Sequence, residues 1–300
     1  MISRNRVKLS LTFILISCLI GCGGGGGDSA PLPKPAPIIN SLLKPMDLNL
    51  DCRTNLYTSV ILVDPKINPE YGYENNSWGS WGLYDSPAPS KPWSQCIGMG
   101  FAGMNTVVAR WVWDFGDNIS SGVRSYPEIV YGYKPTGNVD NSPSLPEVIN
   151  SITSIDINWN IEIDRGNGSG WVLLESWLSN TSKPYSLKSG DVNLELGIVI
   201  DCWGANGWCN PAGEIVNIGK NLYIYNIHSS PNLGNPNMVS FHSIKTLSGQ
   251  NNIDLKLFLN FLKERNVISD IHYINDIEFG TEIINGKGEV RLNSYSVTVK

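Results

Sequence analysis

The sequence has little charge and little histidine, and its apolar N-terminal run is short. Only 16% of its 300 residues are charged, against about 25% in a typical soluble protein. The 22 basic and 27 acidic residues give a formal net charge of −5, which argues against a nucleic-acid interface built on phosphate contacts. Three histidines leave little for a histidine-rich metal site, and no metal or cofactor is expected.

The first 46 residues are predicted to be an export signal and a tether. Three basic residues precede the mostly apolar run 9–20, the pattern of a secretory signal, and this run is shorter than the ~20 residues of a membrane-spanning helix. It ends in Leu-Ile-Gly-Cys22, which resembles a bacterial lipobox, whose cysteine is lipidated; an ordinary secretory signal cut nearby is the alternative. Gly23–Gly27 and four alternate prolines predict a flexible, then extended, spacer.

We therefore expect a lipoprotein signal peptide over residues 1–21, a lipid-anchored tether over 22–46 and a folded domain over 47–300. The exported chain would be anchored in a membrane by its lipid, at the outer membrane or cell surface. The sequence gives no basis for an oligomeric state.

Export to an oxidising compartment predicts that the remaining cysteines form disulfides. One cysteine leaves with the signal and Cys22 takes the lipid. Four remain: Cys52, Cys96, Cys202 and Cys209. Three pairings are possible, and the spacing favours Cys52–Cys96 and Cys202–Cys209. A zinc site is not expected, because the chain has no C-x-x-C and no histidine near these cysteines in sequence.

The domain is predicted to be rich in β-strands. Residues 155–164 alternate strictly between apolar and polar side chains, as in a strand with one wet face. Residues 192–201 do the same, with Glu195, Gly197 and Val199 on the non-core face. Further strand-like runs, among them 171–177, are separated by turn-rich stretches, and only 254–265 has helical spacing. Many short strands at this spacing predict a sandwich or a jelly roll.

Two glutamates occupy similar positions on separate predicted strands. Glu195 lies in the middle of 192–201, and Glu282 alternates with apolar residues in the run 274–283. Two carboxylates facing one groove are what glycoside hydrolysis requires, since one attacks the anomeric carbon and the other protonates the leaving oxygen. Solvated glutamates on an exposed sheet are the alternative, because periodicity alone does not show that the two strands face each other.

Several motifs occur in a fixed order along nearly the whole domain. They are Asn75-Asn76-Ser77-Trp78-Gly79, Ser125–Ile129 (SYPEI), Pro211-Ala212-Gly213, the predicted helix, and Gly280-Thr281-Glu282 followed by Gly286. Together they resemble glycoside hydrolase family 12, the endo-β-1,4-glucanases and xyloglucan hydrolases. The resemblance implies an all-β fold, a jelly-roll β-sandwich of two curved antiparallel sheets with one α-helix.

The resemblance also assigns roles to residues. Glu195 matches the family nucleophile, Glu282 matches the acid/base, and Glu175 falls where the family has an aspartate bonded to the nucleophile. Trp78 matches a tryptophan that stacks on a sugar ring, with Asn76 as its hydrogen-bonding neighbour. An indole suits the apolar face of a pyranose, and polar neighbours suit its hydroxyl rim.

Two tryptophans follow the predicted nucleophile strand closely, and we expect them at the cleft edge. They are Trp203, which we predict to bind substrate, and Trp208. The chain departs from the family where a methionine and a tryptophan are replaced by Gly197 and Val199. Since both lie on the face of Glu195, we expect the floor of the site to lack two large side chains.

We therefore predict a retaining endo-β-1,4-glucanase that acts on a cellulose-type glucan, a mixed-linkage glucan or xyloglucan. A non-catalytic glycan-binding surface lipoprotein on the same fold is the alternative, motivated by Gly197 and Val199. A xylanase of the related jelly-roll family fits the N-N-x-W-G and G-T-E motifs less well. A structural envelope protein would leave the paired glutamates without a role.

Overall fold

The computed structural model describes residues 44–54, 61–62, 70–81, 92–103, 105–116, 122–135, 139–140, 144–184, 190–204, 207–228 and 237–300. These residues belong to one compact unit, Ile39–Lys300. The predicted signal peptide, Cys22 and the tether up to residue 43 lie outside the described residues. None of the helices described is long and apolar enough to cross a membrane.

The described part consists almost entirely of strands, with one α-helix, α1 (Leu255–Glu264). The strands are β1 (Asp51–Thr54), β2 (Ile61–Leu62), β3 (Tyr71–Asn76), β4 (Ser94–Phe101), β5 (Val107–Asp114), β6 (Tyr126–Lys134), β7 (Val139–Asp140), β8 (Glu147–Val148), β9 (Ile155–Ser179), β10 (Val192–Trp203), β11 (Glu214–Ile218), β12 (Asn221–His228), β13 (Asn237–Ser243), β14 (Gly249–Asp254), β15 (Tyr273–Ile274) and β16 (Asp276–Val299).

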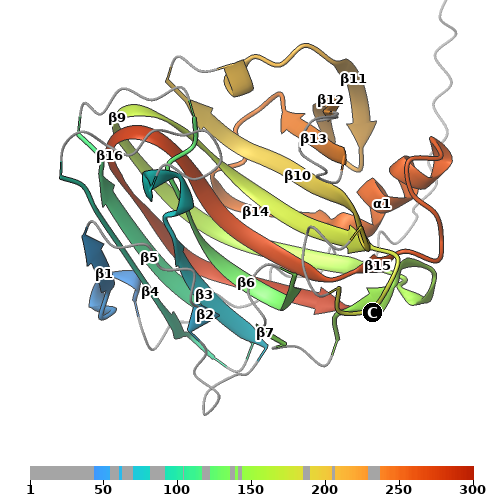
Figure 1. The fold of residues 1–300 in the computed structure, drawn as a ribbon, viewed down its shortest axis with the longest axis horizontal. Coiled ribbons are helices and arrows are strands. Elements are labelled where there is room, and N and C mark those ends of the chain that lie inside the picture. Colours follow the sequence, from blue (N-terminus) through green and yellow to red (C-terminus); the bar gives the residue numbers. More distant parts are fainter. Residues whose placement is uncertain are drawn as a thin grey trace, which may run out of the picture. The chain divides into compact units, whose positions relative to one another are not determined.

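Two long strands, β9 and β16, pair with each other along nearly their whole length and run through both layers of the fold (Figure 1). Residues 155–164 pair with 289–299 in one layer, and residues 168–175 pair with 278–286 in the other. The β9–β16 pair bends between these halves, where Gly168 and Gly286 have φ angles of 104° and 80°. A Cβ at either glycine would collide with the backbone of the facing strand, so the bend requires glycine there.

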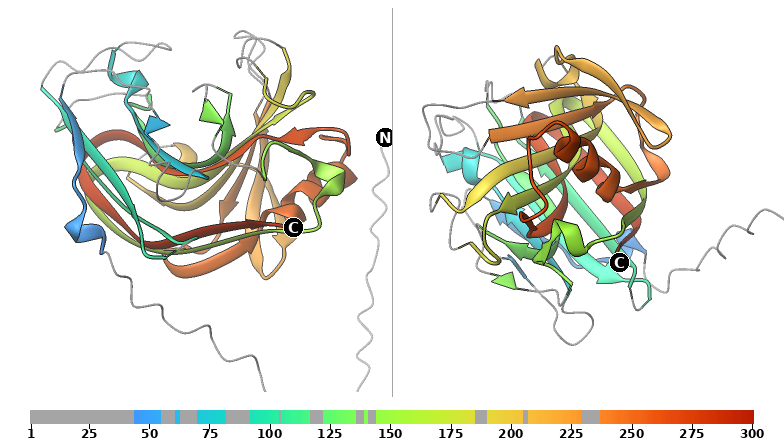
Figure 2. Two further views of the ribbon diagram at one scale, coloured as in Figure 1. Left: turned by 90° about the horizontal axis from the view of Figure 1, so that it is seen from below. Right: turned by 90° about the vertical axis from the view of Figure 1, so that its right-hand side faces the viewer.

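The β9–β16 pair is extended by a different set of strands in each layer. In one layer β5, β4 and β1 extend from β16, and β14 extends from β9. In the other layer β6 and β3 extend from β16, and β10, β13, β12 and β11 extend from β9. The two curved layers are visible edge-on in Figure 2. This architecture confirms the predicted jelly-roll sandwich, with one exception to its antiparallel pairing: β10 and β13 are parallel.

The main hydrophobic core lies between the two layers. Trp159 of the first layer contacts Phe279 of the second, with ring centroids 5.8 Å apart, and Phe279 contacts Tyr295 at 5.2 Å. The predicted alternation of 155–164 is confirmed, since its isoleucines and Trp159 face this core while Asn158 and Glu162 are exposed. Full burial of each such apolar side chain contributes about 1.5–3 kcal/mol.

Helix α1 forms where its spacing predicts and covers the core side of β12 and β13. Its buried face consists of Leu255, Phe258, Leu259 and Leu262. Asp254 caps its first turn by accepting a hydrogen bond from the backbone N–H of Lys256 at 3.0 Å. Because α1 occupies one face of these strands, the opposite face of the same layer is left for the site described below.

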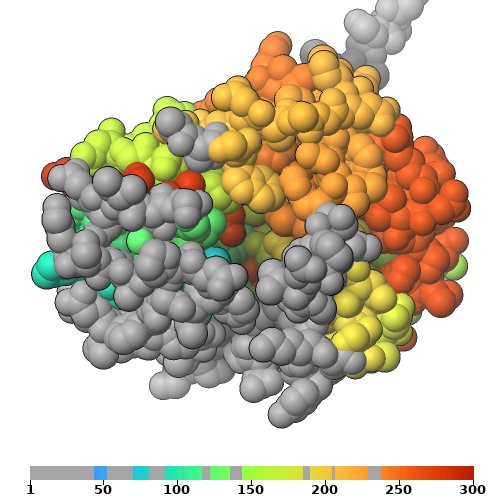
Figure 3. All heavy atoms as spheres, turned by 45° about the horizontal axis from the view of Figure 1, so that its top comes forward, coloured from blue at the N-terminus to red at the C-terminus, as the bar shows by residue number. Residues whose placement is uncertain are grey.

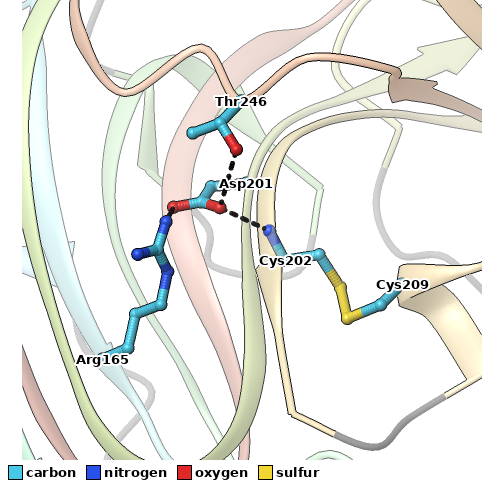
Figure 4. Close-up of a disulfide and its surroundings, with 5 residues drawn as sticks. All are labelled: Arg165, Asp201, Cys202, Cys209 and Thr246. Atoms are coloured by element: carbon cyan, nitrogen blue, oxygen red, sulfur yellow. Dashed lines mark hydrogen bonds and ion pairs between the residues drawn. A yellow bond between two sulfur atoms is a disulfide. The ribbon is translucent and has the colours of Figure 1, made fainter.

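Both favoured disulfides are present. Cys52–Cys96 joins directly opposed residues of β1 and β4. Cys202–Cys209 ties the end of β10 to the short 3-10 helix Gly207–Cys209 (Figure 4). The adjoining carboxylate of Asp201 is buried, accepts a hydrogen bond from the Cys202 N–H at 2.9 Å and pairs with Arg165. These contacts fix the strand end from which the loop with Trp208 departs.

Candidate active site

One layer is formed by β3, β6, β10 and the adjoining halves of β9 and β16. One of its faces does not take part in the main core. Alternate residues of each strand point to it, and they include Glu195 of β10, Glu175 of β9, and Glu278 and Glu282 of β16. A small separate apolar cluster lines the same face: Tyr126, Trp171, Leu173, Val199 and Ile284. In Figure 3 the surface is hollowed between the green and the yellow-to-orange parts of the chain, and red atoms lie within the hollow. We refer to this surface as the acidic face.

Glu195 and Glu282 lie on the two strands that flank β9. Glu195 is opposite Trp177 and Glu282 is opposite Trp171, six residues apart along β9, which is about 20 Å in a flat strand. Nevertheless, repulsion from Glu195 is one cause of the raised pKa of Glu282. The curvature of the layer therefore brings the two carboxyl groups within electrostatic reach of each other.

Both glutamates hold their protons more tightly than a glutamate in water. Burial, followed by repulsion from Glu278, raises the pKa of Glu195 to about 7, while Lys134 lowers it in part. Burial, followed by repulsion from Glu195, raises the pKa of Glu282 to about 8, and the indole of Trp171 opposes this. Of the two carboxyl groups, Glu282 has the higher pKa. Carboxyl groups of one site whose pKa values are pushed apart are candidates for an acid and a base.

Glu175 lies between these strands, where the sequence predicts the partner of the nucleophile. It is opposite Gly197 on β10 and Glu278 on β16, and it is 6% exposed. Burial, followed by repulsion from Glu195, Glu278 and Glu282, raises its pKa well above the ordinary value. Burial and these neighbouring carboxyl groups therefore favour the protonated form of Glu175.

Sequence reasoning missed a buried group of charges on the acidic face. The ammonium of Lys134, at the end of β6, lies 2.6 Å from Glu128 Oε1, 3.0 Å from Glu74 Oε2 and 3.2 Å from Glu278 Oε2. All four side chains are buried. The alternation of Glu278 with Glu282 was a usable signal for one of them, but charged residues such as Lys134 are ordinarily placed in solvent.

The motif Asn75–Gly79 lies on the opposite side of β16 from Glu195. Asn76, the last residue of β3, donates a hydrogen bond from Nδ2 to Glu128 Oε1 at 3.2 Å. Trp78 follows in the 3-10 helix Trp78–Trp81 and is half-buried. A side chain at Gly79 would collide with the carbonyl of Val123, which explains the glycine of the motif.

The structure does not bring Trp203 to the acidic face, so the prediction that it binds substrate is not supported. The register of β10 on β9 shifts between Val199 and Asp201, and this bulge turns Trp203 into the main core. There it is 8% exposed and packs against Trp113, with ring centroids 6.1 Å apart.

Trp208 lies on the acidic face instead, held by the Cys202–Cys209 loop. Its ring stacks on Trp171 at 5.4 Å and on His242 at 5.6 Å, and it contacts His228 at 4.9 Å. The Nε2 atoms of both histidines are hydrogen-bonded to Ser240 Oγ, at 2.9 and 3.1 Å. The sequence assigned no role to these histidines, because they are far apart from the motifs in the chain.

The floor beside Glu195 is not empty, although Gly197 has no side chain. A Cβ at Gly197 would lie 3.4 Å from Met238 Cε and 3.6 Å from Leu173 Cδ1. Val199 is 4% exposed and packs in the apolar cluster. Side chains of the neighbouring strands therefore fill part of the space that the sequence predicted to be open. Among the residues that the structure describes, no group of three or more His, Cys, Asp or Glu is placed to hold a metal ion.

Curated proteins similar to this chain are endoglucanases and xyloglucan-specific endoglucanases. No protein-family model matches the chain. Endoglucanase S of Pectobacterium parmentieri is 28% identical over 242 residues, covering 78% of this chain and 83% of the relative. Xyloglucan-specific endo-beta-1,4-glucanase A of Emericella nidulans is 27% identical over 229 residues, covering 75% and 84%.

Solved structures share the fold. A family 12 xyloglucanase from Bacillus licheniformis in complex with a ligand has a TM-score of 0.65 and 24% identity, covering 83% of this chain and 100% of the other. Endoglucanase cel12A from Rhodothermus marinus has a TM-score of 0.64 and 19% identity, covering 84% and 99%.

Proposed function

We propose that this chain, which belongs to glycoside hydrolase family 12, is a retaining endo-β-1,4-glucanase that cleaves internal bonds of a β-glucan. That it is a glycoside hydrolase follows from its curated relatives, which are endoglucanases and xyloglucan-specific endoglucanases. The retaining mechanism and the roles of individual residues are our proposal.

One observation carries the proposal above the others. Glu195 and Glu282 project onto one face from the two strands that flank β9. Burial raises both pKa values, with repulsion from Glu278 adding to the shift of Glu195 and repulsion from Glu195 adding to that of Glu282, whose pKa is the higher. A solvated pair on an open sheet would show neither effect. Two carboxyl groups with separated protonation are the requirement of retaining glycoside hydrolysis.

In this mechanism Glu195 attacks the anomeric carbon while Glu282 gives its proton to the departing glycosidic oxygen. The bond to the leaving sugar breaks as the ester between Glu195 and the retained sugar forms. Glu282, now ionised, takes a proton from water, whose oxygen attacks the same carbon and releases Glu195. Glu175 lies on the strand beside Glu195, and burial favours its protonated form, so it is positioned to stabilise the carboxylate of Glu195.

The substrate class follows from the surroundings of the pair. Asn76 lies on the β3 side, followed in the chain by Trp78, and the ring of Trp208 lies on the β13 side, stacked on Trp171 and His242. Such surfaces suit pyranose rings, whose faces are apolar and whose rims are polar. We expect cleavage of xyloglucan, mixed-linkage glucan or carboxymethylcellulose, consistent with the activities named for the relatives.

A non-catalytic glycan-binding protein on the same fold is the second candidate, and Gly197 and Val199 motivate it. The two candidate functions are distinguished by counting the reducing ends released from tamarind xyloglucan, barley β-glucan and carboxymethylcellulose. The chain from residue 22 is compared with Glu195→Gln and Glu282→Gln, and Glu162→Gln is the matched control, since Glu162 is exposed on the other layer. Release by the parent and the control, abolished in both variants, supports the enzyme. Retention of glycan in an affinity gel without release would contradict it.

We further propose that the protein is exported and anchored through a lipid on Cys22. The lipobox-like sequence and the two disulfides support this, because disulfides persist in oxidising compartments. Mass spectrometry of the N-terminal peptide from native membranes tests it. Diacylglyceryl on Cys22, lost in Cys22→Ser, is the expected result, and an unmodified N-terminus elsewhere would contradict the anchor.

A further inference from the structure

Lys134 occupies an environment that is unusual for a lysine. Its side chain is 4% exposed, and three carboxylates lie within 3.2 Å of its ammonium nitrogen. Burying an ammonium is unfavourable unless partners compensate it. Here the partners outnumber it three to one, so the group as a whole has too much negative charge for every carboxyl to ionise.

The protons in this group are distributed unevenly. Burial lowers the pKa of Lys134, but its carboxylates outweigh this and hold the pKa well above the ordinary value. Burial raises the pKa of Glu278, yet Lys134 and hydrogen bonds from Glu128 and Asp276 bring it below the ordinary value. Burial and repulsion from Glu278 raise the pKa of Glu128. Lys134 and Glu278 are therefore shifted towards their ionised forms, and Glu128 is shifted towards its protonated form.

Two chains of hydrogen bonds lead from Lys134 to the proposed site. On one side, Glu128 Oε1 accepts from Lys134 at 2.6 Å and also from Asn76 Nδ2 at 3.2 Å. On the other side, Glu278 contacts Lys134 through Oε2 at 3.2 Å and accepts from the indole N–H of Trp177 through Oε1 at 3.2 Å. Trp177 is the residue opposite Glu195 in the sheet.

We propose that Lys134 is a positioning residue of the active site: it clamps Glu128 and Glu278 and thereby fixes Asn76 and the Trp177–Glu195 pair relative to each other. The inference rests on the proposed roles of Glu195 and Asn76. Lys134 itself is buried on the acidic face and touches no substrate in this account.

The clamp has an electrostatic consequence at Glu195. The charged or titratable groups that face Glu195 come from three strands, and its β13 partner is the uncharged Met238. They are Glu175 of β9, Glu278 and Glu282 of β16, and Lys134 of β6. Glu278 raises the pKa of Glu195 and Lys134 lowers it. Because Glu195 must be ionised to attack, the acid limb of the pH profile of kcat/KM follows its pKa.

Opposite shifts are therefore expected from the two halves of one ion pair. Lys134→Met moves the acid limb to higher pH by about 0.5–1 unit, and Glu278→Gln moves it to lower pH by a similar amount. The double variant Lys134→Met/Glu278→Gln returns the limb to near the parent's position. Lys263→Met is the matched control, since Lys263, on helix α1, forms a 2.9 Å pair with Asp270, away from the acidic face.

The experiment measures pH profiles of kcat/KM for the parent and these four variants on the glucan that the parent cleaves best. Opposite shifts with recovery in the double variant support the clamp. Shifts of the same sign, or no shift in either single variant, overturn it while leaving the proposed function intact. Where Lys134→Met does not fold, Glu278→Gln decides alone: a limb that stays put or moves to higher pH overturns the inference.

An inactive parent would instead overturn the proposed function. The clamp is then tested by ¹³C NMR titration of the Glu195 carboxyl in the parent and in Glu278→Gln. A lower pKa in the variant supports the clamp, and an unchanged or higher pKa contradicts it.

Discussion

Removing the carboxyl group of Glu282 should stabilise the fold at high pH while it destroys activity. In the unfolded chain a glutamate titrates near 4.5, but in the folded protein the pKa of Glu282 is raised to about 8. The folded state therefore binds this proton more tightly. Between these values the unfolded state has released its proton and the folded state has not, so the stability that the group contributes is present below 4.5 and is lost as pH rises towards 8.

The size of the effect follows from the difference between the two pKa values. At about 1.4 kcal/mol per pH unit, the difference corresponds to about 5 kcal/mol as an upper limit. Glu282 is half-buried, so screening by water reduces this, and we expect about 2–4 kcal/mol. Part of the effect is shared with Glu195, whose charge contributes to the raised pKa, so the two substitutions should not be additive.

Urea unfolding at pH 4.5, 6.5 and 8.5, followed by tryptophan fluorescence with the disulfides intact, measures this. The parent should lose stability as pH rises, Glu282→Gln should lose less by about 2–4 kcal/mol, and Glu162→Gln, changed on an exposed surface, should follow the parent. If Glu282→Gln falls as steeply with pH as the parent, Glu282 is solvated and the account of the acidic face is wrong.

Three further predictions concern packing. Trp203→Ala should destabilise the fold by about 3–5 kcal/mol, because it leaves a cavity in the core. Trp208→Ala should leave the free energy of unfolding within about 1 kcal/mol of the parent's and raise KM on glucan about tenfold, which corresponds to about 1.4 kcal/mol. An equal loss of stability in both variants would contradict their placement on opposite faces. Leu259→Ala, at a fully buried position of α1, should cost about 2–5 kcal/mol in urea unfolding, and a smaller cost would mean that α1 packs loosely on β12 and β13. The double variant Cys202→Ser/Cys209→Ser should lose about 2 kcal/mol of folding stability, because the disulfide closes a loop with a separation of only 7 residues. It should also raise KM as Trp208→Ala does. An unchanged KM would show that the loop does not hold Trp208 in the site.

Much of the strand structure was predictable because one face of each strand is wet. The alternation of 155–164 identified its core face correctly, as did that of 192–201 up to Ile200, and the spacing of 254–265 identified α1. These patterns are local consequences of burial, so a single sequence contains them.

The continuity of the long strands was not predictable from the same patterns. The sequence predicted separate strands over 155–164 and 171–177, but both belong to β9. The segment between them contains Gly166, Asn167 and Gly168 and is exposed, which is typical of a turn. In the structure the pairing with β16 continues through it. Whether such a segment turns or bends depends on the partner strand, which local composition does not specify.

Two features of the site depend on non-local geometry in the same way. Strict alternation from Glu195 would place Trp203 on the acidic face, but the bulge after Val199 reverses the side on which it lies. Lys134 and Glu278 are separated by 144 positions in the chain, and only the folded layer shows that they neutralise each other. The catalytic candidates themselves were found because their motifs are local.

Trapping the covalent intermediate tests the central claim most directly. The parent is incubated with an activated 2-deoxy-2-fluoro-β-cellobioside, whose fluorine slows release of the sugar from the enzyme, and the protein is digested and analysed by mass spectrometry. The account predicts one added 2-fluorocellobiosyl group, on the peptide that contains Glu195, and no label in Glu195→Gln. Labelling of another residue, or release of product with inverted anomeric configuration, would contradict it.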